Sequence, residues 1–216
     1  MLARLGVVFL AAALAEPGAP PKPVGPDAVW SPPAGFVASV HAACDGRSGD
    51  EFGVCFVDRM RAAGASPPAL DFAQRTGNLG YLRRFRDVPL VGVAWAEFPF
   101  RANANSVCFL VNGLPPMIDV DDLSLVSPAA LEANADWVAL SKAYPKLAIF
   151  PSDRLGEGAV VATPRPGGGV RFAVEYALVD GCHACARLGV LRLGFNFDGE
   201  AKYLGVAVLA VLPSAR

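Results

Sequence analysis

Hydrophobic positions in the first third of the chain recur every three to four residues, which is the spacing of one face of an α-helix. Ser31-Pro32 begins this pattern, because serine caps free backbone N–H groups and proline suits the first helical turn. Ser48 and Glu51 form the next start signal, a capping box. The pattern predicts three helices, of which the first two pack as a hairpin: 31–45, 48–64 and 66–76.

After Gly77 the hydrophobic period changes from 3.6 to 2, which indicates β-strands. Strands are predicted over 79–87, 91–98, 106–112, 116–120, 146–150, 158–163, 169–179, 186–197 and 202–212. One helix, from Ser127-Pro128 to Tyr144, separates the fourth strand from the fifth. Helices in one block and strands in another predict an α+β fold, in which an N-terminal helical hairpin and further helices pack on a curved, mainly antiparallel sheet.

Residues 1–15 have the pattern of a secretory signal peptide. Arg4 supplies a positive charge, residues 5–14 are almost uniformly apolar, and Ala13-Leu14-Ala15 is the small-x-small sequence that signal peptidase cleaves. The apolar stretch is shorter than the ~20 residues of a transmembrane helix. We therefore expect a periplasmic or secreted mature protein that begins at Glu16 and has no transmembrane anchor.

Seven prolines follow within residues 16–33, and proline-rich sequence favours extended backbone. We predict a linker over these residues, with Trp30 docking on the body of the fold, and a single α+β domain over residues 34–216. Loss of the signal peptide removes one of the 19 basic residues and none of the 20 acidic ones. This balance gives no reason to expect a nucleic-acid partner, because binding there depends on clustered Lys and Arg.

The five cysteines are first interpreted as disulfides, because disulfides persist in the compartments to which exported proteins travel. Cys44 ends the first predicted helix, and Cys55 lies two turns into the second. Both lie on apolar faces that meet when the helices form a hairpin. We predict a Cys44–Cys55 disulfide that stabilises the fold by ~3 kcal/mol on the chain-entropy model. Cys108, in a predicted strand, remains as a buried free thiol.

Gly181-Cys182-His183-Ala184-Cys185 lies between two predicted strands and has three interpretations. The favoured one is a structural Cys182–Cys185 disulfide that closes a hairpin tip. The second is a redox couple in which His183 favours a neighbouring thiolate, without the helix N-terminus that thioredoxin-type motifs use. The third is a metal site, in which Cys182, His183 and Cys185 contribute ligands to Zn²⁺ or Cu(I).

Two further groups of polar residues are candidates for ligand contacts. Asp119 and Asp121 share one face of a predicted strand, and closely spaced carboxylates bind Ca²⁺ or share a proton. Arg101, Asn103 and Asn105 gather in a turn and offer a guanidinium and two amides to a carboxylate or a sugar. Both groups are also common at exposed strand ends and turns, where they have structural roles. No cofactor is expected from these patterns.

The sequence favours a binding or accessory module over an enzyme, because it contains no nucleophile elbow, HExxH pair, P-loop or dinucleotide-binding fingerprint. The expected partner is another envelope protein, which the module inhibits or assists, or a small ligand in the concave face of the sheet. A thiol-redox or metal-handling protein that uses Cys182, His183 and Cys185 is the alternative. A hydrolase that uses Asp119 and Asp121 is the third hypothesis.

The export hypothesis predicts the N-terminus of the mature protein. When the full chain is expressed in a host that recognises its signal, the intact mass should correspond to a protein that begins at Glu16, with oxidised cysteines. A cytoplasmic polypeptide that keeps residues 1–15 and has every sulfur reduced would contradict the hypothesis.

Overall fold

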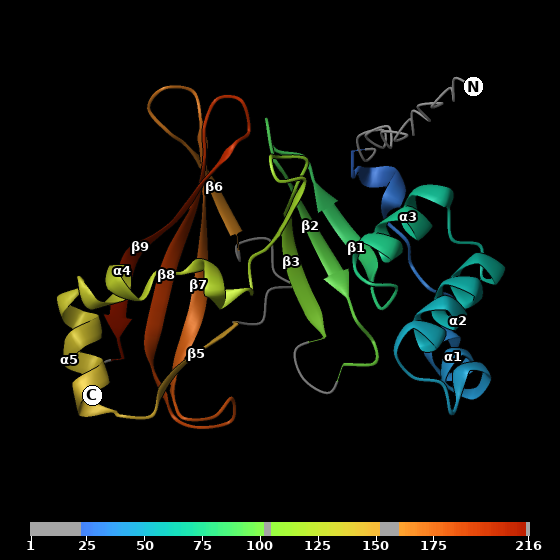
Figure 1. The fold of residues 1–216 in the computed structure, drawn as a ribbon, viewed down its shortest axis with the longest axis horizontal. Helices are drawn as coiled ribbons and strands as arrows, with labels where there is room; N and C mark the ends of the chain where they lie inside the picture. The colour runs from blue at the N-terminus through green and yellow to red at the C-terminus, as the bar shows by residue number, and fades with distance from the viewer. Residues whose placement is uncertain (1–22, 102–104, 152–159, 215–216) are drawn as a thin grey trace, which may run out of the picture.

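Helices come first along the chain and antiparallel strands follow, as Figure 1 shows for the computed structural model. The structure describes residues 23–101, 105–151 and 160–214, so the predicted signal peptide, the first part of the predicted linker and Asn103 lie outside it. The helices are α1 (Phe36–Cys44), α2 (Gly49–Ala62), α3 (Pro67–Arg75), α4 (Pro128–Glu132) and α5 (Ala135–Ala143). The strands are β1 (Tyr81–Arg86), β2 (Gly92–Glu97), β3 (Ser106–Val111), β4 (Met117–Asp119), β5 (Leu147–Pro151), β6 (Val160–Pro164), β7 (Val170–Asp180), β8 (Arg187–Phe197) and β9 (Tyr203–Pro213).

The strands form two antiparallel sheets, which corrects the expectation of a single curved sheet within the confirmed α+β class. The N-terminal sheet has the order β1-β2-β3-β4. The C-terminal sheet has the order β5-β7-β8-β9, and β6 also pairs with β7. Both groups of strands carry apolar residues at alternate positions, and two such faces bury each other when the sheets stack.

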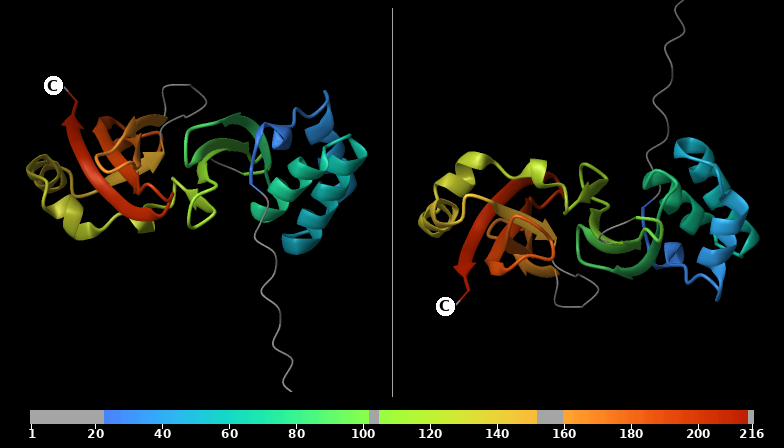
Figure 2. Two further views of the ribbon diagram at one scale, coloured as in Figure 1. Left: turned by 90° about the horizontal axis from the view of Figure 1, so that it is seen from above. Right: turned by 90° about the horizontal axis from the view of Figure 1, so that it is seen from below.

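The stacked faces of the two sheets form the main core. Trp95 and Leu110 of the N-terminal sheet and Phe172, Tyr176 and Leu193 of the C-terminal sheet belong to one continuous cluster of buried side chains. Viewed from above and below, helices α1–α3 lie on one side of the N-terminal sheet and the C-terminal sheet lies on its other side (Figure 2). The N-terminal sheet is therefore covered on both sides, which agrees with the almost complete burial of β2 and β3.

Helix α3 covers the other face of the N-terminal sheet. Phe72 packs there with Leu82, Ala94 and Phe109. Ser66 caps α3 at the predicted start of the third helix, because its hydroxyl accepts a hydrogen bond from the Ala69 N–H at 3.3 Å.

The start of α1 and the cap of α2 differ from the prediction. Helix α1 begins after Gly35, whose φ of 80° lies in the left-handed region that glycine adopts easily, and not at Ser31. Ser48 precedes α2 as expected, but its side chain makes no capping hydrogen bond. The sequence therefore predicted where both helices lie, but it did not predict the first residue of α1 or the missing capping bond of α2.

Residues 23–33, the described part of the predicted linker, lie against the body of the fold. The Val24 N–H donates to Oδ1 of Asn112 at 2.7 Å, and Nδ2 of Asn112 donates to the Val24 carbonyl at 2.8 Å. The Trp30 N–H donates to the Leu82 carbonyl at 2.9 Å. This segment, which contains a short 3₁₀ helix over Pro26–Ala28 where extended backbone was predicted, thus docks on the N-terminal sheet, and Trp30 does so as expected.

The helix expected between Ser127 and Tyr144 is two helices. Helix α4 ends at Glu132, and α5 starts after Asn134, whose Oδ1 accepts a hydrogen bond from the Trp137 N–H at 3.0 Å. Asparagine side chains compete with the backbone for hydrogen bonds and so favour caps over helix interiors. The break allows the chain to bend, and both short helices lie beside β9 (Figure 1).

The two sheets are also joined where β9 begins. The Leu114 N–H donates to the Ala201 carbonyl at 2.9 Å, and the Tyr203 N–H donates to the Leu114 carbonyl at 2.8 Å. Burial, together with the nearby charge of Asp122, raises the pKa of Tyr203 to about 12. The phenol therefore stays neutral at this junction at physiological pH.

The docked N-terminal segment predicts a large effect of Trp30→Ala on stability. Trp30 is 8% exposed, and its ring contacts Phe36 and Tyr81 edge to face at centroid distances of 4.9 and 5.3 Å. The substitution should lower the free energy of unfolding in urea by about 3–5 kcal/mol. Val37→Ala, at an exposed position of α1, is the control and should change it by less than about 0.5 kcal/mol. Equal effects would show that Trp30 does not stabilise the fold.

Candidate functional site

Both predicted disulfides are present. Cys44 at the end of α1 and Cys55 in α2 are buried and bonded, with their Cα atoms 5.9 Å apart. Cys182 and Cys185 are exposed and bonded, with their Cα atoms 5.0 Å apart. Cys108 is buried and belongs to neither disulfide. Disulfides persist in oxidising environments and are rare in reducing ones, so this pairing suggests an oxidising, extracytoplasmic location.

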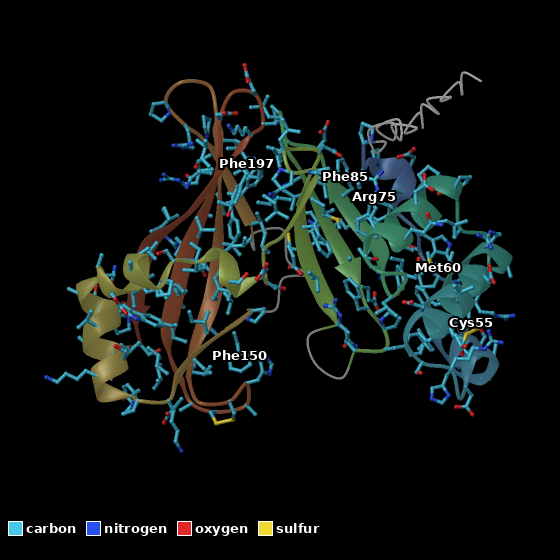
Figure 3. The ribbon with its side chains drawn as sticks, viewed as in Figure 1. Cys55, Met60, Arg75, Phe85, Phe150 and Phe197 are labelled. Carbon is cyan, nitrogen blue, oxygen red and sulfur yellow. A yellow bond between two sulfur atoms is a disulfide. The ribbon has the colours of Figure 1, made fainter. Side chains whose placement is uncertain are left out.

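The Cys182–Cys185 bond closes the tip of the β7–β8 hairpin. The Cys185 N–H donates to the Cys182 carbonyl at 2.9 Å, and residues 181–186 contain no helix. His183 is exposed, and its ring centroid lies 5.4 Å from that of Phe150 in β5. Figure 3 shows the S–S bond at the tip of the hairpin. The helix dipole that stabilises the thiolate of a thioredoxin-type motif is therefore missing from this loop.

Asp119 and Asp121 lie at the end of β4 and are linked through the backbone of Asp121. Asp119 is the last residue of β4, and its Oδ1 accepts a hydrogen bond from the Asp121 backbone N–H at 2.8 Å. This is the turn-forming contact that aspartate makes with its own backbone two residues on. Within the three described ranges, no group of three or more His, Cys, Asp and Glu residues is arranged to hold a metal ion.

Arg101 and Asn105 lie in the exposed turn between β2 and β3. The guanidinium carbon of Arg101 lies 3.6 Å from the centroid of the Phe98 ring, a cation–π contact. Asn103, the third member of the predicted group, is outside the described residues. In this turn the Arg101 guanidinium therefore packs on the Phe98 ring.

A surface that the sequence analysis did not single out is the outer face of the C-terminal sheet. The residues of β7 that alternate with buried Phe172 and Tyr176 are half-buried or exposed there. A groove of about 510 Å³ crosses this face, lined by Val161, Thr163, Arg171, Ala173, Glu175, Arg192, Leu209 and Ala210. An antiparallel sheet usually presents polar residues on a solvent-facing side, whereas small and apolar residues make up half of this lining.

The two arginines of the groove have different partners. Arg192 donates from Nε and Nη2 to Oε1 of Glu175 on the neighbouring strand, at 3.1 and 2.5 Å. Arg171 donates from Nε to the neutral Oδ1 of Asn196 at 2.7 Å. No carboxylate of the described chain forms an ion pair with Arg171. The Arg192 charge is therefore balanced by Glu175 within the groove, and no carboxylate of the described residues balances the Arg171 charge.

Asn196 determines the position of Arg171. Its side chain is 8% exposed, and its Nδ2 donates to the carbonyls of Gly194 and Gly205 at 3.0 and 3.2 Å. Because Nδ2 has these two acceptors, Oδ1 is the atom that faces Arg171. A Cβ atom on Gly194 would lie 3.1 Å from Cδ of Arg171 and 3.0 Å from Cδ2 of Leu209. The bare backbone of Gly194 thus makes room for both side chains.

The sequence contained a signal for this surface. Arg171 and Glu175 alternate with apolar residues along β7, which marks them as members of its outer face. The β7–β8 pairing then places Asn196 opposite Arg171 and Arg192 opposite Glu175. Only the hairpin register, which a sequence pattern leaves open, was needed to bring these four side chains together.

No protein-family model matches the chain, and no curated protein and no solved structure is significantly similar to it. None of the helices described is long and apolar enough to cross a membrane. Function depends on sites more than on folds, so the groove and the disulfide loop are the features that bear on it.

The exposure of the two disulfides predicts the order of their reduction. Thiol–disulfide exchange needs access to a sulfur atom, so a low concentration of dithiothreitol should reduce exposed Cys182–Cys185 while buried Cys44–Cys55 stays intact. Alkylation of the native protein followed by peptide mass mapping identifies the bond. Reduction of both bonds at the same rate would contradict the prediction.

A thiol count and an unfolding measurement provide two quantitative tests of the disulfide pairing. Without reductant, the denatured protein should contain one free thiol, that of Cys108. Removal of the short loop by Cys182→Ser with Cys185→Ser should lower the free energy of unfolding by about 2 kcal/mol, and Cys44→Ser with Cys55→Ser by about 3 kcal/mol, because the longer loop restricts the unfolded chain more.

Proposed function

We propose that this protein works outside the cytoplasm as a binding module, and that a partner protein docks on the outer face of its C-terminal sheet. The observation that carries the proposal is the groove of about 510 Å³. Ala173 and Ala210 are among its lining residues, and a buried asparagine holds Arg171 in the same groove.

Two features support export. The first fifteen residues have the charge, the apolar stretch and the cleavage sequence of a signal peptide. The helical α1–α2 hairpin and the β7–β8 strand hairpin are each closed by a disulfide, a bond that persists in the compartments of exported proteins. A reducing cytosol would work against both bonds.

The chemistry of the groove supports binding more than catalysis. Acid–base catalysis needs a titratable group whose protonation changes near the working pH. Glu175 is the carboxylate of the lining, and it forms an exposed ion pair with Arg192. No histidine or cysteine is among the lining residues.

The shape of the surface favours a protein partner over a small ligand. Small-molecule sites are concave and enclose most of the ligand surface, whereas this groove lies on the outer face of a sheet between side chains of β6, β7, β8 and β9. Val161 and Leu212, which point to the same side of the sheet, are 50% and 46% exposed. They extend the apolar surface across the face from β6 to β9, as a protein interface requires.

A thiol-redox role for Cys182–Cys185 is a second candidate, supported by the exposure of both cysteines next to His183. A reduction potential near those of oxidising catalysts, about −120 to −180 mV, would favour it, and a value below about −300 mV would favour a structural bond. His183→Ala should raise or lower the potential if the imidazole takes part. Zinc or copper binding by these residues requires the reduced thiols.

Photo-crosslinking in the cell envelope of the natural host tests the docking proposal. A photoreactive amino acid at Ala210, in the groove, should give one discrete adduct whose mass spectrum identifies the partner. The same amino acid at Ala129, exposed on α4 and not part of the groove, is the control and should give none. Absence of an adduct at Ala210, or equal adducts at both positions, would contradict docking on this face.

A further inference from the structure

We infer that the groove recognises a carboxylate of the docked protein, held by the two Nη groups of Arg171. This inference rests on the proposed function and adds the chemistry of the group that is bound. The partner segment would present a glutamate or aspartate side chain with apolar residues on either side. Its carboxylate would accept hydrogen bonds from the Arg171 guanidinium, which Asn196 already holds in position.

The Arg171 side chain is fixed before any partner arrives. Its Nε donates to Asn196, and Asn196 is held in turn by the carbonyls of Gly194 and Gly205. A free arginine side chain loses rotamer entropy when it binds a ligand. A guanidinium that is already oriented loses less, so a bond to it contributes more to affinity.

The geometry leaves the bidentate edge of Arg171 for a ligand. A guanidinium presents five N–H donors, of which the Nε donor is used by Asn196. No hydrogen bond to the described residues engages Nη1 or Nη2 of Arg171. The two Nη groups together match the two oxygens of a carboxylate, which accept parallel hydrogen bonds from such a fork.

The charges of the groove indicate a group with one negative charge. Glu175 and Arg192 balance each other across β7 and β8, which leaves the charge of Arg171. A single carboxylate balances that charge. A phosphate dianion would bring a second negative charge onto a surface whose remaining lining is Val161, Ala173, Leu209 and other uncharged residues.

The surroundings of Arg171 indicate apolar neighbours for the bound carboxylate. Leu209 lies over Gly194, next to the arginine stem. Val161 of β6, opposite Ala173 of β7, lines the other side of the groove. A valine or similar side chain on each side of the acidic residue would contact these two walls and exclude water from the ion pair, which strengthens it.

Two blocked tripeptides, acetyl-valine-glutamate-valine-amide and its glutamine analogue, provide the probe. They should be titrated into the oxidised protein while the Nε–H signal of Arg171 and the side-chain amide of Asn196 are followed by NMR. The glutamate peptide should give saturable shifts, and the glutamine peptide should bind about tenfold more weakly, because it lacks the charge-assisted bonds. Equal affinities, or no saturable shift with the glutamate peptide, would overturn the inference.

Substitutions separate the guanidinium fork from simple charge. Arg171→Lys keeps the charge and loses the fork, and should weaken the glutamate peptide about tenfold. Arg187→Gln, at an exposed arginine outside the groove, is the matched control and should leave the affinity unchanged. If both variants bind the peptide as the unmodified protein does, Arg171 is not the receptor.

A second pair of variants covers the case in which Arg171 substitutions disturb the fold. Ala173→Glu places a carboxylate on the same face of β7 and should abolish binding of the glutamate peptide by occupying Arg171. Ala173→Gln has the same size without the charge and should retain most of the affinity. Equal losses would mean that shape alone matters, which would overturn the inference.

The peptide and crosslinking experiments fail in different ways. If the Ala210 crosslink forms but the two peptides bind equally, docking on the face stands and carboxylate recognition by Arg171 is wrong. If the glutamate peptide binds through Arg171 but no crosslink forms, the groove binds carboxylates and a docked protein is wrong. Loss of both results removes the proposed function together with the inference.

Discussion

β7 and β8 pair along their whole length, from Val170 opposite Phe197 to Val179 opposite Arg187, and this register determines both faces of the C-terminal sheet. On the inner side it brings the apolar residues of both strands to the surface that stacks on the N-terminal sheet. On the outer side it places Arg171 beside Asn196 and Glu175 beside Arg192. A shift of one residue would turn the charged side chains of one strand toward the core, so burial of the apolar face and assembly of the groove depend on the same pairing.

The two disulfides act on the two hairpins of the protein in different ways. Cys44–Cys55 joins α1 to α2 inside a cluster that includes Trp30 and Tyr81, where the bond and the packing reinforce each other. Cys182–Cys185 closes the turn between β7 and β8, the two strands whose pairing register assembles the groove. Its position gives the CxxC sequence a structural purpose: it restricts the turn that aligns β7 with β8, although both sulfurs remain accessible to solvent.

The layers of the fold explain why the outer face of the C-terminal sheet is the available surface. Both sides of the N-terminal sheet are buried, one by helices and one by the second sheet. The inner side of the C-terminal sheet is covered in the same cluster by side chains that include Leu140 of α5. The remaining face lies on strands paired in one antiparallel sheet, and the Arg171–Asn196 network on it is held by backbone carbonyls of the same sheet. A site built on strands in this way is ordered before it binds.

Features that depend on neighbouring residues were predictable from the sequence. The α+β order, the Ser66 cap and both disulfides follow from hydrophobic period, capping chemistry and cysteines that are 11 and 3 residues apart. The number of sheets, the cap at Asn134 that divides one predicted helix into two, and the bond between Arg171 and Asn196, 25 residues apart, became known only from the tertiary structure. Hydrophobic period and capping reflect the preferences of neighbouring residues. The number of sheets and the Arg171–Asn196 bond depend instead on which apolar faces bury each other and on the strand register. The free energy of that burial and pairing arises only when distant segments of the chain are in contact.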